Sequence, residues 1–432
     1  MNKPEPPTQR RRSMCIIKSV TWSDLTRQRK LIMSKRLRDC LSLHDFEEAA
    51  RKVLPRPLFA YVSGAVEDGL SLSANRASFA HYGFKPDVLV DVSKRDMSVE
   101  LFGQRFTAPV GIAPMGLAAL TGYRGDVVLA QAAAEANVPC IMSGSSLIRL
   151  EEVMEAAPGT WFQAYLPGAQ DQIDALIARV QQAKVQTLII TVDTPVAANR
   201  ENNVRAGFST PLRPSLGLMY QGISHPRWLF ATFLRTLRQH GMPHFENNYA
   251  TRGAPILSSS VLRDFSDRGH LNWDHLTQIR KQWRGAMIIK GVLNASDAAR
   301  CQRHGMDGII VSNHGGRQLD GSVAPLQVLP EILAAAGEIV VMLDSGIRRG
   351  TDVLKALALG AKATFIGRPF NYANAVAGRQ GVDHALGLIV EEIRRDMGLL
   401  GVTRLDGIRL DHLVVNGDTQ GFGPLMNRAS DA

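Results

Sequence analysis

Polar and ionisable residues stand at the ends of a series of short apolar runs. The run at 187–193 ends on Asp193, and the run at 308–312 leads into His314 and Arg317. If these runs are parallel strands, the side chains that follow them meet at one edge of the sheet. There, a histidine beside a carboxylate can accept a proton, and arginines can hold an anion. The residues of this kind are Ser143, Gln163, Tyr165, Thr191, Asp193, Lys290, Ser312, His314, Arg317, Asp344, Gly367 and Arg368.

Two motifs after the last two runs indicate a phosphate site. The first is Asp344-Ser-Gly-Ile-Arg-Arg-Gly350, and the second is Ile366-Gly-Arg368. Glycine lets backbone N–H groups approach an anion closely, and arginine grips phosphate through two hydrogen bonds. Loops in this position bind phosphate in many barrel enzymes, those that use sugar phosphates and those that use flavins alike.

The apolar runs predict the fold that must position these groups. They are continuous rather than alternately apolar and polar, which is typical of strands buried on both faces of a parallel sheet. Amphipathic stretches separate them, so we predict an α/β fold, a closed (β/α)8 TIM barrel with an N-terminal helical segment and a small hairpin. An open doubly wound sheet is the alternative, although no GxGxxG turn follows the first run. The expected strands are 110–114, 140–143, 160–165, 187–193, 286–290, 308–312, 339–344 and 363–367, and the expected helices are 125–136, 150–156, 171–183, 275–283, 296–304, 326–336, 350–359 and 372–377.

One connection is far too long for a simple barrel. About eighty residues separate the fourth run from the fifth, where two to six are usual. We therefore expect an inserted segment over 196–273, after strand 4. Its stretch 225–238 has apolar residues at helical spacing with arginines on the other side. That pattern fits a surface helix packed on the barrel or a helix lying in a membrane interface.

The positive charge lies at the N-terminus. Residues 1–40 carry a net charge of +8 out of +10 for the whole chain, so the rest is nearly neutral. A neutral body does not predict a nucleic-acid partner. We expect residues 1–40 to be a basic, disordered arm, residues 41–415 to be one barrel domain and residues 416–432 to be a C-terminal tail. Translation starting at Met33 is an alternative for the arm.

The cysteines and the absence of long apolar segments narrow the class further. Cys15, Cys40, Cys140 and Cys301 are far apart and form no CxxC pair. They predict neither a disulfide framework nor a metal site, and they fit a cytoplasmic, reducing environment. No window is long and apolar enough for a spanning helix, and no apolar region of a secretory signal follows the basic run.

The longest motif resembles that of a known family. Ser312-Asn-His-Gly-Gly-Arg-Gln-Leu-Asp320 is similar to the signature of the FMN-dependent 2-hydroxy-acid dehydrogenases and oxidases, which include glycolate oxidase, L-lactate dehydrogenase and (S)-mandelate dehydrogenase. The resemblance runs from about Leu43 to Val415. It implies a (β/α)8 barrel, an FMN cofactor, a homotetramer and oxidation of a small L-2-hydroxy acid to the 2-oxo acid.

The resemblance also implies roles for individual residues. His314 matches the catalytic base, and Asp193 matches the carboxylate that orients it. Tyr61, Arg200 and Arg317 match groups that bind the substrate carboxylate, and Tyr165 matches a tyrosine near the hydroxyl-bearing carbon. Lys290 matches the lysine at the N1/O2 edge of the flavin. The other matching cofactor positions are Ala113, Pro114, Met115, Ser143, Gln163, Thr191 and Ser312 for the ring and ribityl chain, with Asp344, Gly346, Arg348, Gly367 and Arg368 for the ribityl chain and phosphate.

Elementary chemistry agrees with these roles. A histidine with a reference pKa of about 6.5 can accept a proton near neutral pH. A neighbouring aspartate fixes its tautomer and favours the imidazolium that forms. Two arginines can hold a carboxylate in one plane, and a lysine can stabilise an anionic reduced flavin.

Departures from the family pattern bear on substrate and acceptor. Ser145 and Ala197 stand where glycolate oxidase has larger residues, so we expect a lactate- or mandelate-like substrate. The insertion around His225 looks like the loop of the membrane-associated members. We therefore expect peripheral contact of 215–240 with the inner face of the cytoplasmic membrane, and electron transfer to a quinone or cytochrome.

Two alternatives stay open at this point. An oxidase would pass the electrons to O2 and produce H2O2. A flavin-free sugar-phosphate lyase or isomerase would use the same phosphate loops, although it does not explain His314, Arg317 and Arg200 together.

Overall fold

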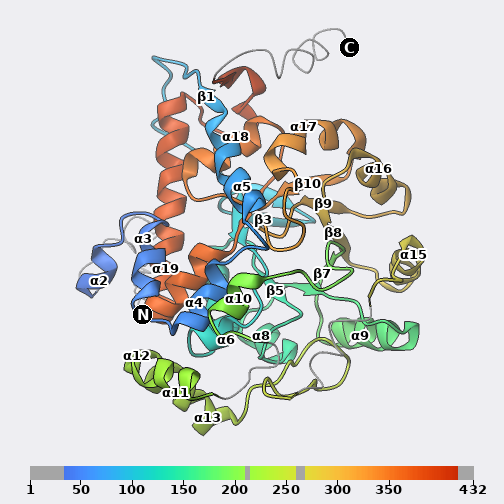
Figure 1. The fold of residues 1–432 in the computed structure, drawn as a ribbon. Helices are drawn as coiled ribbons and strands as arrows, with labels where there is room; N and C mark the ends of the chain where they lie inside the picture. The colour runs from blue at the N-terminus through green and yellow to red at the C-terminus, as the bar shows by residue number, and fades with distance from the viewer. Residues whose placement is uncertain (1–33, 210–214, 259–267, 417–432) are drawn as a thin grey trace, which may run out of the picture.

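Eight parallel strands form the centre of the molecule. The computed structural model describes residues 34–209, 215–258 and 268–416. The strands lie in the order β4-β11-β10-β9-β8-β7-β6-β5, and a bridge between Ile112 and Cys140 joins the two ends into a closed barrel (Figure 1). This confirms the predicted TIM barrel over the open sheet. The strands are β4 (Val110–Ile112), β5 (Ile141–Ser143), β6 (Trp161–Ala164), β7 (Thr187–Thr191), β8 (Ala286–Val292), β9 (Gly308–Val311), β10 (Val340–Leu343) and β11 (Thr364–Ile366).

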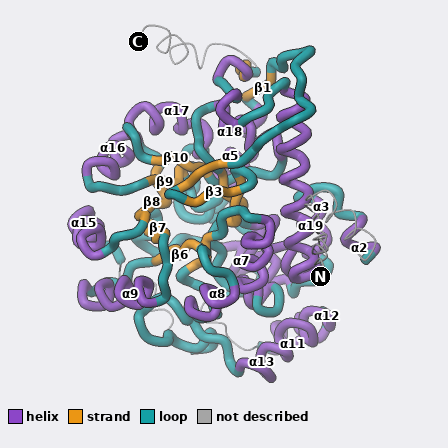
Figure 2. The backbone as a smooth tube through the Cα atoms, turned by 180° about the vertical axis from the view of Figure 1, so that it is seen from behind, coloured by secondary structure: helices purple, strands orange, loops and turns teal. Residues whose placement is uncertain are grey.

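Helices surround the barrel on all sides (Figure 2). Each covers the strands with an apolar face, and all but the last begin and end within a few residues of the predicted bounds. The last one extends well beyond the predicted 372–377: Gly378, with a φ of +53°, breaks it, and a second helical stretch continues because its apolar face is buried. The helices are α7 (Gly125–Ala136), α8 (Leu150–Ala156), α9 (Gln170–Gln182), α15 (Trp273–Gln282), α16 (Ala295–Arg303), α17 (Pro325–Ala336), α18 (Gly350–Ala358) and α19 (Arg368–Leu400).

The segment before the barrel contributes helices at the carboxyl ends of the strands and a hairpin at their amino ends. It forms α3 (Asp45–Arg51), α4 (Arg56–Ser63), α5 (Leu70–Ala80) and the predicted hairpin of β2 (Val99–Leu101) with β3 (Gln104–Phe106). Phe102 and Phe106 of this hairpin contact Trp161, with ring centroids 5.7 and 6.1 Å apart. An antiparallel pair that we did not predict, β1 (Tyr82–Phe84) with β12 (Leu413–Val415), joins this segment to the end of the domain.

Part of the expected disordered arm is ordered. The helix α2 (Lys35–Arg38) lies against α19, and Leu37 and Cys40 are buried. His384 Nε2 donates a hydrogen bond to the carbonyl of Cys40 over 2.8 Å. The expectation of a free arm is therefore wrong for residues 34–40, because two apolar side chains among the charged ones pack into the core. Residues 1–33 and the tail from 417 onward lie outside the described residues.

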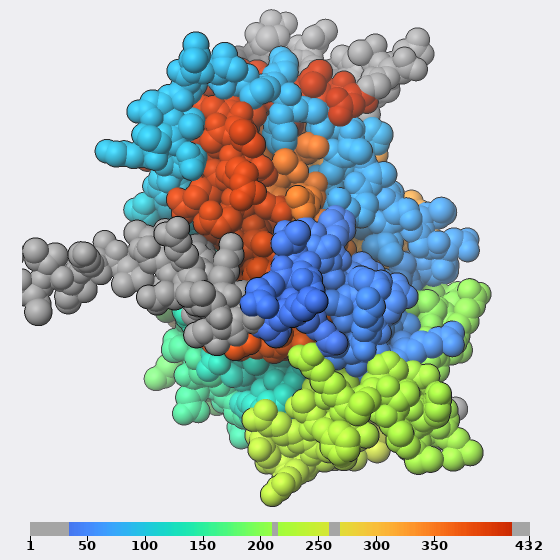
Figure 3. Space-filling view, turned by 90° about the vertical axis from the view of Figure 1, so that its left-hand side faces the viewer, coloured from blue at the N-terminus to red at the C-terminus, as the bar shows by residue number. Residues whose placement is uncertain are grey.

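The insertion between β7 and β8 forms a helical layer at one side of the barrel. It contains α10 (Glu201–Arg205), α11 (Leu216–Ile223), α12 (Pro226–Trp228), the π-helical turn η1 (Leu229–Leu234) and α13 (Arg235–His240). Figure 3 shows it as a yellow-green ledge directly beside the blue N-terminal helices. There, the backbone N–H of Arg56 donates to Gln221 Oε1 over 3.1 Å.

This layer has one packed face and one exposed face. Trp228 Nε1 donates to the carbonyl of Leu120, and Arg227 donates to the carbonyl of Val376. These contacts agree with a surface helix packed on the barrel. Within the described residues, no helix combines the length and apolar character needed to cross a bilayer. The large apolar side chains on the exposed face are Leu216, Met219, Tyr220, Ile223, Phe230 and Leu234.

Candidate active site

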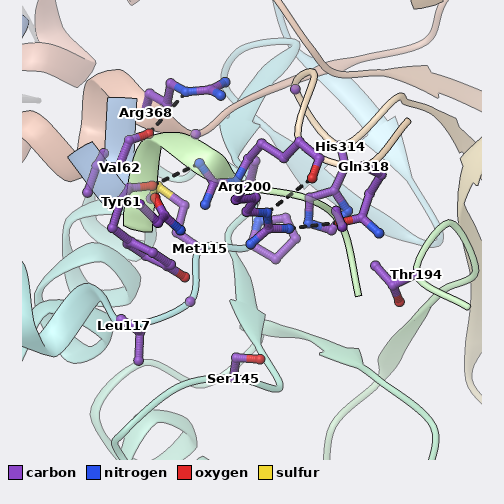
Figure 4. A pocket seen from close by; sticks show the side chains of 18 of the residues that line it. Tyr61, Val62, Met115, Leu117, Ser145, Thr194, Arg200, His314, Gln318 and Arg368 are labelled. Atoms are coloured by element: carbon purple, nitrogen blue, oxygen red, sulfur yellow. Dashed lines mark hydrogen bonds between the residues drawn. The ribbon is translucent and has the colours of Figure 1, made fainter. Parts of the chain in front are cut away.

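A cavity of about 820 Å³ lies at the carboxyl ends of the barrel strands. Most of the predicted site residues line it, and Figure 4 shows Tyr61, Arg200, His314 and Arg368 around it. The exceptions are Ser143, Gln163, Asp193 and Ser312, which lie behind residues that do. One wall comes from the insertion, so the cavity is a joint product of the barrel and the inserted segment.

His314 and Asp193 form a directed pair. His314 Nδ1 lies 2.9 Å from Asp193 Oδ1. Because an ionised carboxylate only accepts hydrogen bonds, Nδ1 carries the proton and Nε2 is left to accept another. Gly291 permits this contact: its φ is +106°, and a side-chain carbon there would lie 2.7 Å from Cβ of Asp193.

The environment keeps this pair in the protonation states that proton abstraction requires. Burial lowers the pKa of His314, and the carboxylate of Asp193 opposes part of that shift. Burial alone would raise the pKa of Asp193, but His314 and Lys290 together bring it below its ordinary value. The histidine is therefore neutral and the aspartate ionised at pH 7.

Two arginines stand beside the pair. Arg317 Nη1 donates to the carbonyls of Tyr61 and Gly64 over 2.9 and 3.0 Å. Arg200 Nε donates to the carbonyl of Arg317 over 3.1 Å. Burial, together with the positive charges of Arg200 and Arg368, lowers the pKa of Arg317 to about 9. A buried group of cations at a cavity wall favours an anionic ligand.

Two tyrosines complete the region. The ring of Tyr61 packs on Phe208 at 4.8 Å and lies under the guanidinium of Arg317 at 5.1 Å. Tyr165 follows β6, and burial raises its pKa, so its hydroxyl stays protonated. The guanidinium of Arg268 lies 5.0 Å from the centre of its ring.

A second group of hydrogen-bonding side chains lies at the carboxyl ends of β5 and β6, behind the residues that line the cavity. Gln163 Oε1 accepts from Ser143 Oγ over 3.2 Å and from the backbone N–H of Gly144 over 3.3 Å. Its Nε2 is buried and has no partner among the described residues. An unsatisfied buried amide is costly, so a ligand acceptor belongs there.

Lys290 links three strand ends. Its Nζ lies 2.9 Å from Asp344 Oδ2 and 2.8 Å from Ser312 Oγ. Burial lowers the pKa of Lys290, but Asp344 and Asp193 outweigh burial and raise it. The ammonium therefore stays charged in a buried position beside Thr191, where it can stabilise negative charge on a bound group.

The third part of the cavity is cationic and glycine-containing. Arg368 donates to the carbonyls of Val62 and Gly64 over 3.1 and 2.8 Å. Burial lowers the pKa of Arg348 to about 10, and the neighbouring Arg368 acts in the same direction. Gly346 has a φ of +93°, and a side-chain carbon there would lie 2.3 Å from the carbonyl of Asn75. The predicted phosphate loop thus presses its backbone onto α5.

Several residues of the site escaped the sequence analysis. Arg76 of α5 holds the phosphate loop through the carbonyl of Gly346 and through Asp352 Oδ2, the latter over 2.8 Å. Arg268, Phe208 and Phe245 come from parts of the chain with no periodic pattern, and only the tertiary structure brings them to the cavity. Gln318 directly follows Arg317 in the motif 312–320, and this position could have marked it as a site residue.

The donor set matches a flavin mononucleotide. The buried amide of Gln163 and the charged Lys290 suit the polar edge of a ring system, and Arg348 and Arg368 suit a phosphate. Ala113, Pro114 and Met115, directly after β4, supply an apolar wall. Fold and site together define an α/β-barrel oxidoreductase that works with a flavin nucleotide.

Comparison with known proteins gives the same class. The profile of the family described as FMN-dependent dehydrogenase matches residues 50–415. The chain belongs to this family. It is 35% identical over 379 residues to (S)-mandelate dehydrogenase of Pseudomonas putida, covering 88% of this chain and 95% of that protein. It is 39% identical over 381 residues to L-lactate dehydrogenase of Alcaligenes faecalis, with 86% and 97% covered.

Solved structures of similar proteins have the same fold. A crystal structure of the monotopic membrane protein (S)-mandelate dehydrogenase superimposes with a TM-score of 0.80 at 34% identity, covering 87% of this chain and 99% of that one. A mandelate oxidase with a bound difluorinated hydroxy acid gives a TM-score of 0.72 at 32% identity, with 87% and 99% covered.

Proposed function

We propose that this protein oxidises an L-2-hydroxy acid to the corresponding 2-oxo acid. The observation that carries the proposal is the 2.9 Å contact between His314 Nδ1 and Asp193 Oδ1, beside the two arginines of the same cavity. Oxidation of a 2-hydroxy acid needs a group that accepts a proton, next to cationic side chains that bind the carboxylate of the substrate.

Each residue then has a defined task. Arg200 and Arg317, with Tyr61, hold the carboxylate of the substrate, and His314 Nε2 takes up the proton that the substrate loses. Asp193 stabilises the resulting imidazolium. Tyr165 hydrogen-bonds near the carbon that bears the hydroxyl group.

FMN, when bound, supplies the two-electron acceptor for this oxidation. Lys290 holds negative charge at the polar edge of its ring. The residues that hold the rest of the cofactor are Ala113, Pro114, Met115, Ser143, Gln163, Thr191, Ser312, Asp344, Gly346, Arg348, Gly367 and Arg368.

The width of the cavity favours a substrate with a side chain of lactate or mandelate size. Ser145 and Ala197 are small residues on its wall, and Phe245 offers an aromatic surface. The names of the relatives, lactate and mandelate dehydrogenases, point to the same range.

The exposed apolar face of the insertion supports a peripheral attachment to the inner face of the cytoplasmic membrane. A helix that packs on the barrel with one face and exposes leucine, methionine and phenylalanine on the other can lie in a lipid interface. The monotopic relative favours this placement. A membrane quinone or cytochrome is then the electron acceptor. On the family resemblance we also propose a homotetramer.

The visible spectrum of the purified protein tests the proposal. We expect a yellow protein that bleaches when L-lactate or (S)-mandelate is added without oxygen. A colourless protein that cannot be reconstituted with FMN contradicts it. A yellow protein bleached by neither acid directs the search to other 2-hydroxy acids.

Oxygen as acceptor is the second candidate, because mandelate oxidases are among the similar structures. Hydrogen peroxide formed rapidly and in proportion to turnover would establish the oxidase. Slow peroxide formation together with fast reduction of a quinone analogue would establish the dehydrogenase.

A further inference from the structure

The side chain of Gln318 bridges two parts of the candidate active site. Arg200 Nη2 donates to its Oε1 over 2.8 Å (Figure 4). Its Nε2 donates to the backbone carbonyl of Asp193 over 3.0 Å. One amide thus joins the arginine of the insertion to the strand end that carries the partner of His314.

The orientation of this amide follows from its partners. A guanidinium only donates hydrogen bonds, so the oxygen of Gln318 must face Arg200. A carbonyl only accepts, so the nitrogen must face Asp193. A glutamate in the same place would satisfy the arginine and leave the carbonyl of Asp193 without its donor.

Arg200 depends on this bridge because its own segment holds it weakly. Val192, Val196 and Asn199 are exposed, and no helix or strand is present between Thr191 and Glu201. Among the described residues, the side chain of Arg200 donates hydrogen bonds to Gln318 and to the carbonyl of Arg317. A long arginine side chain loses about 2 kcal/mol of rotamer entropy when it is held in one place. Holding it before the ligand arrives removes part of that cost from binding.

We propose that Gln318 is a positioning residue for the substrate carboxylate. It acts through Arg200: it fixes the direction of the guanidinium while keeping its full charge, and it anchors the guanidinium to the strand end at Asp193. This rests on the proposed role of Arg200 as a carboxylate-binding group. Three N–H groups of Arg200, one on Nη2 and two on Nη1, have no protein partner among the described residues, and Arg200 lines the cavity, so they are available to an anion there.

The test is a double-mutant cycle measured by equilibrium binding. The holoenzyme is titrated with a 2-oxo acid, the reaction product, and its dissociation constant is read from the visible difference spectrum of the flavin. We expect Gln318→Leu to raise this constant about tenfold, the size of one hydrogen bond to a charged group. In an Arg200→Met background the same substitution has no further effect, because the group it positions is gone.

Steady-state kinetics provide the second readout. We expect KM for the hydroxy acid to rise in parallel with the dissociation constant, and kcat to change less than about threefold. The reason is that the substitution weakens binding of the substrate and of the transition state equally. Gln327→Leu is the control, because Gln327 is exposed on α17 and the same change of side chain there leaves both constants unaltered.

Gln318→Glu preserves the volume of the side chain, and it tests the positioning role if the Gln318→Leu variant fails to fold. The new carboxylate neutralises Arg200, so binding of the 2-oxo acid weakens while binding of its uncharged amide does not. Two results overturn the proposal: equal effects of Gln318→Leu with and without Arg200, or a lower kcat with unchanged product binding. The titrations with the 2-oxo acid are equilibrium measurements on the oxidised protein, so the double-mutant cycle can be scored without turnover. A wild type that no 2-hydroxy acid bleaches would instead refute the proposed function.

Discussion

The barrel rim and the insertion bring charged groups to one cavity in different ways. At the rim, Lys290 and Asp344 come from β8 and β10, and the ladder through β9 between them sets their spacing. In the insertion, no ladder holds Arg200. Two side-chain hydrogen bonds to the loop after β9 set its position. Backbone pairing therefore places the groups proposed for proton transfer and for the cofactor, while side-chain contacts place one of the two arginines proposed to bind the substrate carboxylate.

The outward faces of the two regions differ as well. The rim faces the cavity, and the helices around the barrel cover its strands. The helical layer of the insertion exposes large apolar side chains, with Leu216 81% and Phe230 65% exposed. We therefore expect mutations at the rim to change the reaction, and mutations on the exposed face of the helical layer to change membrane attachment.

The largest expected effect is at the rim. Changing His314→Gln removes the proton acceptor, and we expect kcat to fall about 10²- to 10⁴-fold. The protein should stay yellow, because the cofactor groups lie elsewhere in the cavity. Stopped-flow reduction of the flavin by the substrate measures the loss. Near-normal reduction by this variant would remove His314 from the reaction.

The pH dependence gives a second test of the rim. The wild-type kcat/KM should fall as the pH drops through the pKa of His314, because only the neutral imidazole accepts a proton. Asp193 raises that pKa against the effect of burial. In Asp193→Asn the acid limb of the pH profile should therefore move to lower pH. The plateau should fall about 100-fold or more, because the imidazolium loses its carboxylate partner. An acid limb that moves to higher pH would contradict this assignment.

A third test addresses the width of the cavity. Ser145 lies on the wall after β5, so Ser145→Trp should narrow the space for the substrate side chain. We expect kcat/KM for the bulkier (S)-mandelate to fall about tenfold more than for L-lactate, within the range of small steric differences. Equal losses for both acids would mean that the substrate side chain points elsewhere.

Substitutions on the exposed face of the insertion should have the smallest effect on catalysis and the largest effect on membrane binding. The pair Phe230→Ser and Leu234→Ser should reduce binding to lipid vesicles, since each exposed apolar side chain contributes its burial in the interface. Turnover with a soluble acceptor should not change. Leu399→Ser is the control, because Leu399 is 70% exposed on α19, outside the insertion. Full vesicle binding by the double variant would refute the interfacial role of this face.

Much of this architecture followed from local patterns. A strand that is buried on both faces has a continuous run of apolar residues in the sequence. The residue that follows such a strand lies at the rim of the barrel. The strands and the rim residues could therefore be predicted together. Arg76 and Gln318 were not singled out, because a charged residue on a helix or an amide in a loop has the same local pattern whether or not it supports a site. The antiparallel pair of β1 with β12 joins segments more than 300 residues apart, and no short-range signal marks it.

By itself the sequence determined the barrel, the order of its units and the residue types at its rim, since hydrophobic periodicity and strand direction are local properties. Only the tertiary structure decided that residues 34–40 pack into the core, that the insertion packs with one face and exposes the other, and that Gln318 bonds to Arg200 at the cavity wall. These features depend on contacts between distant parts of the chain. Their energies come from the shape and pairing of surfaces that exist only after the barrel has closed.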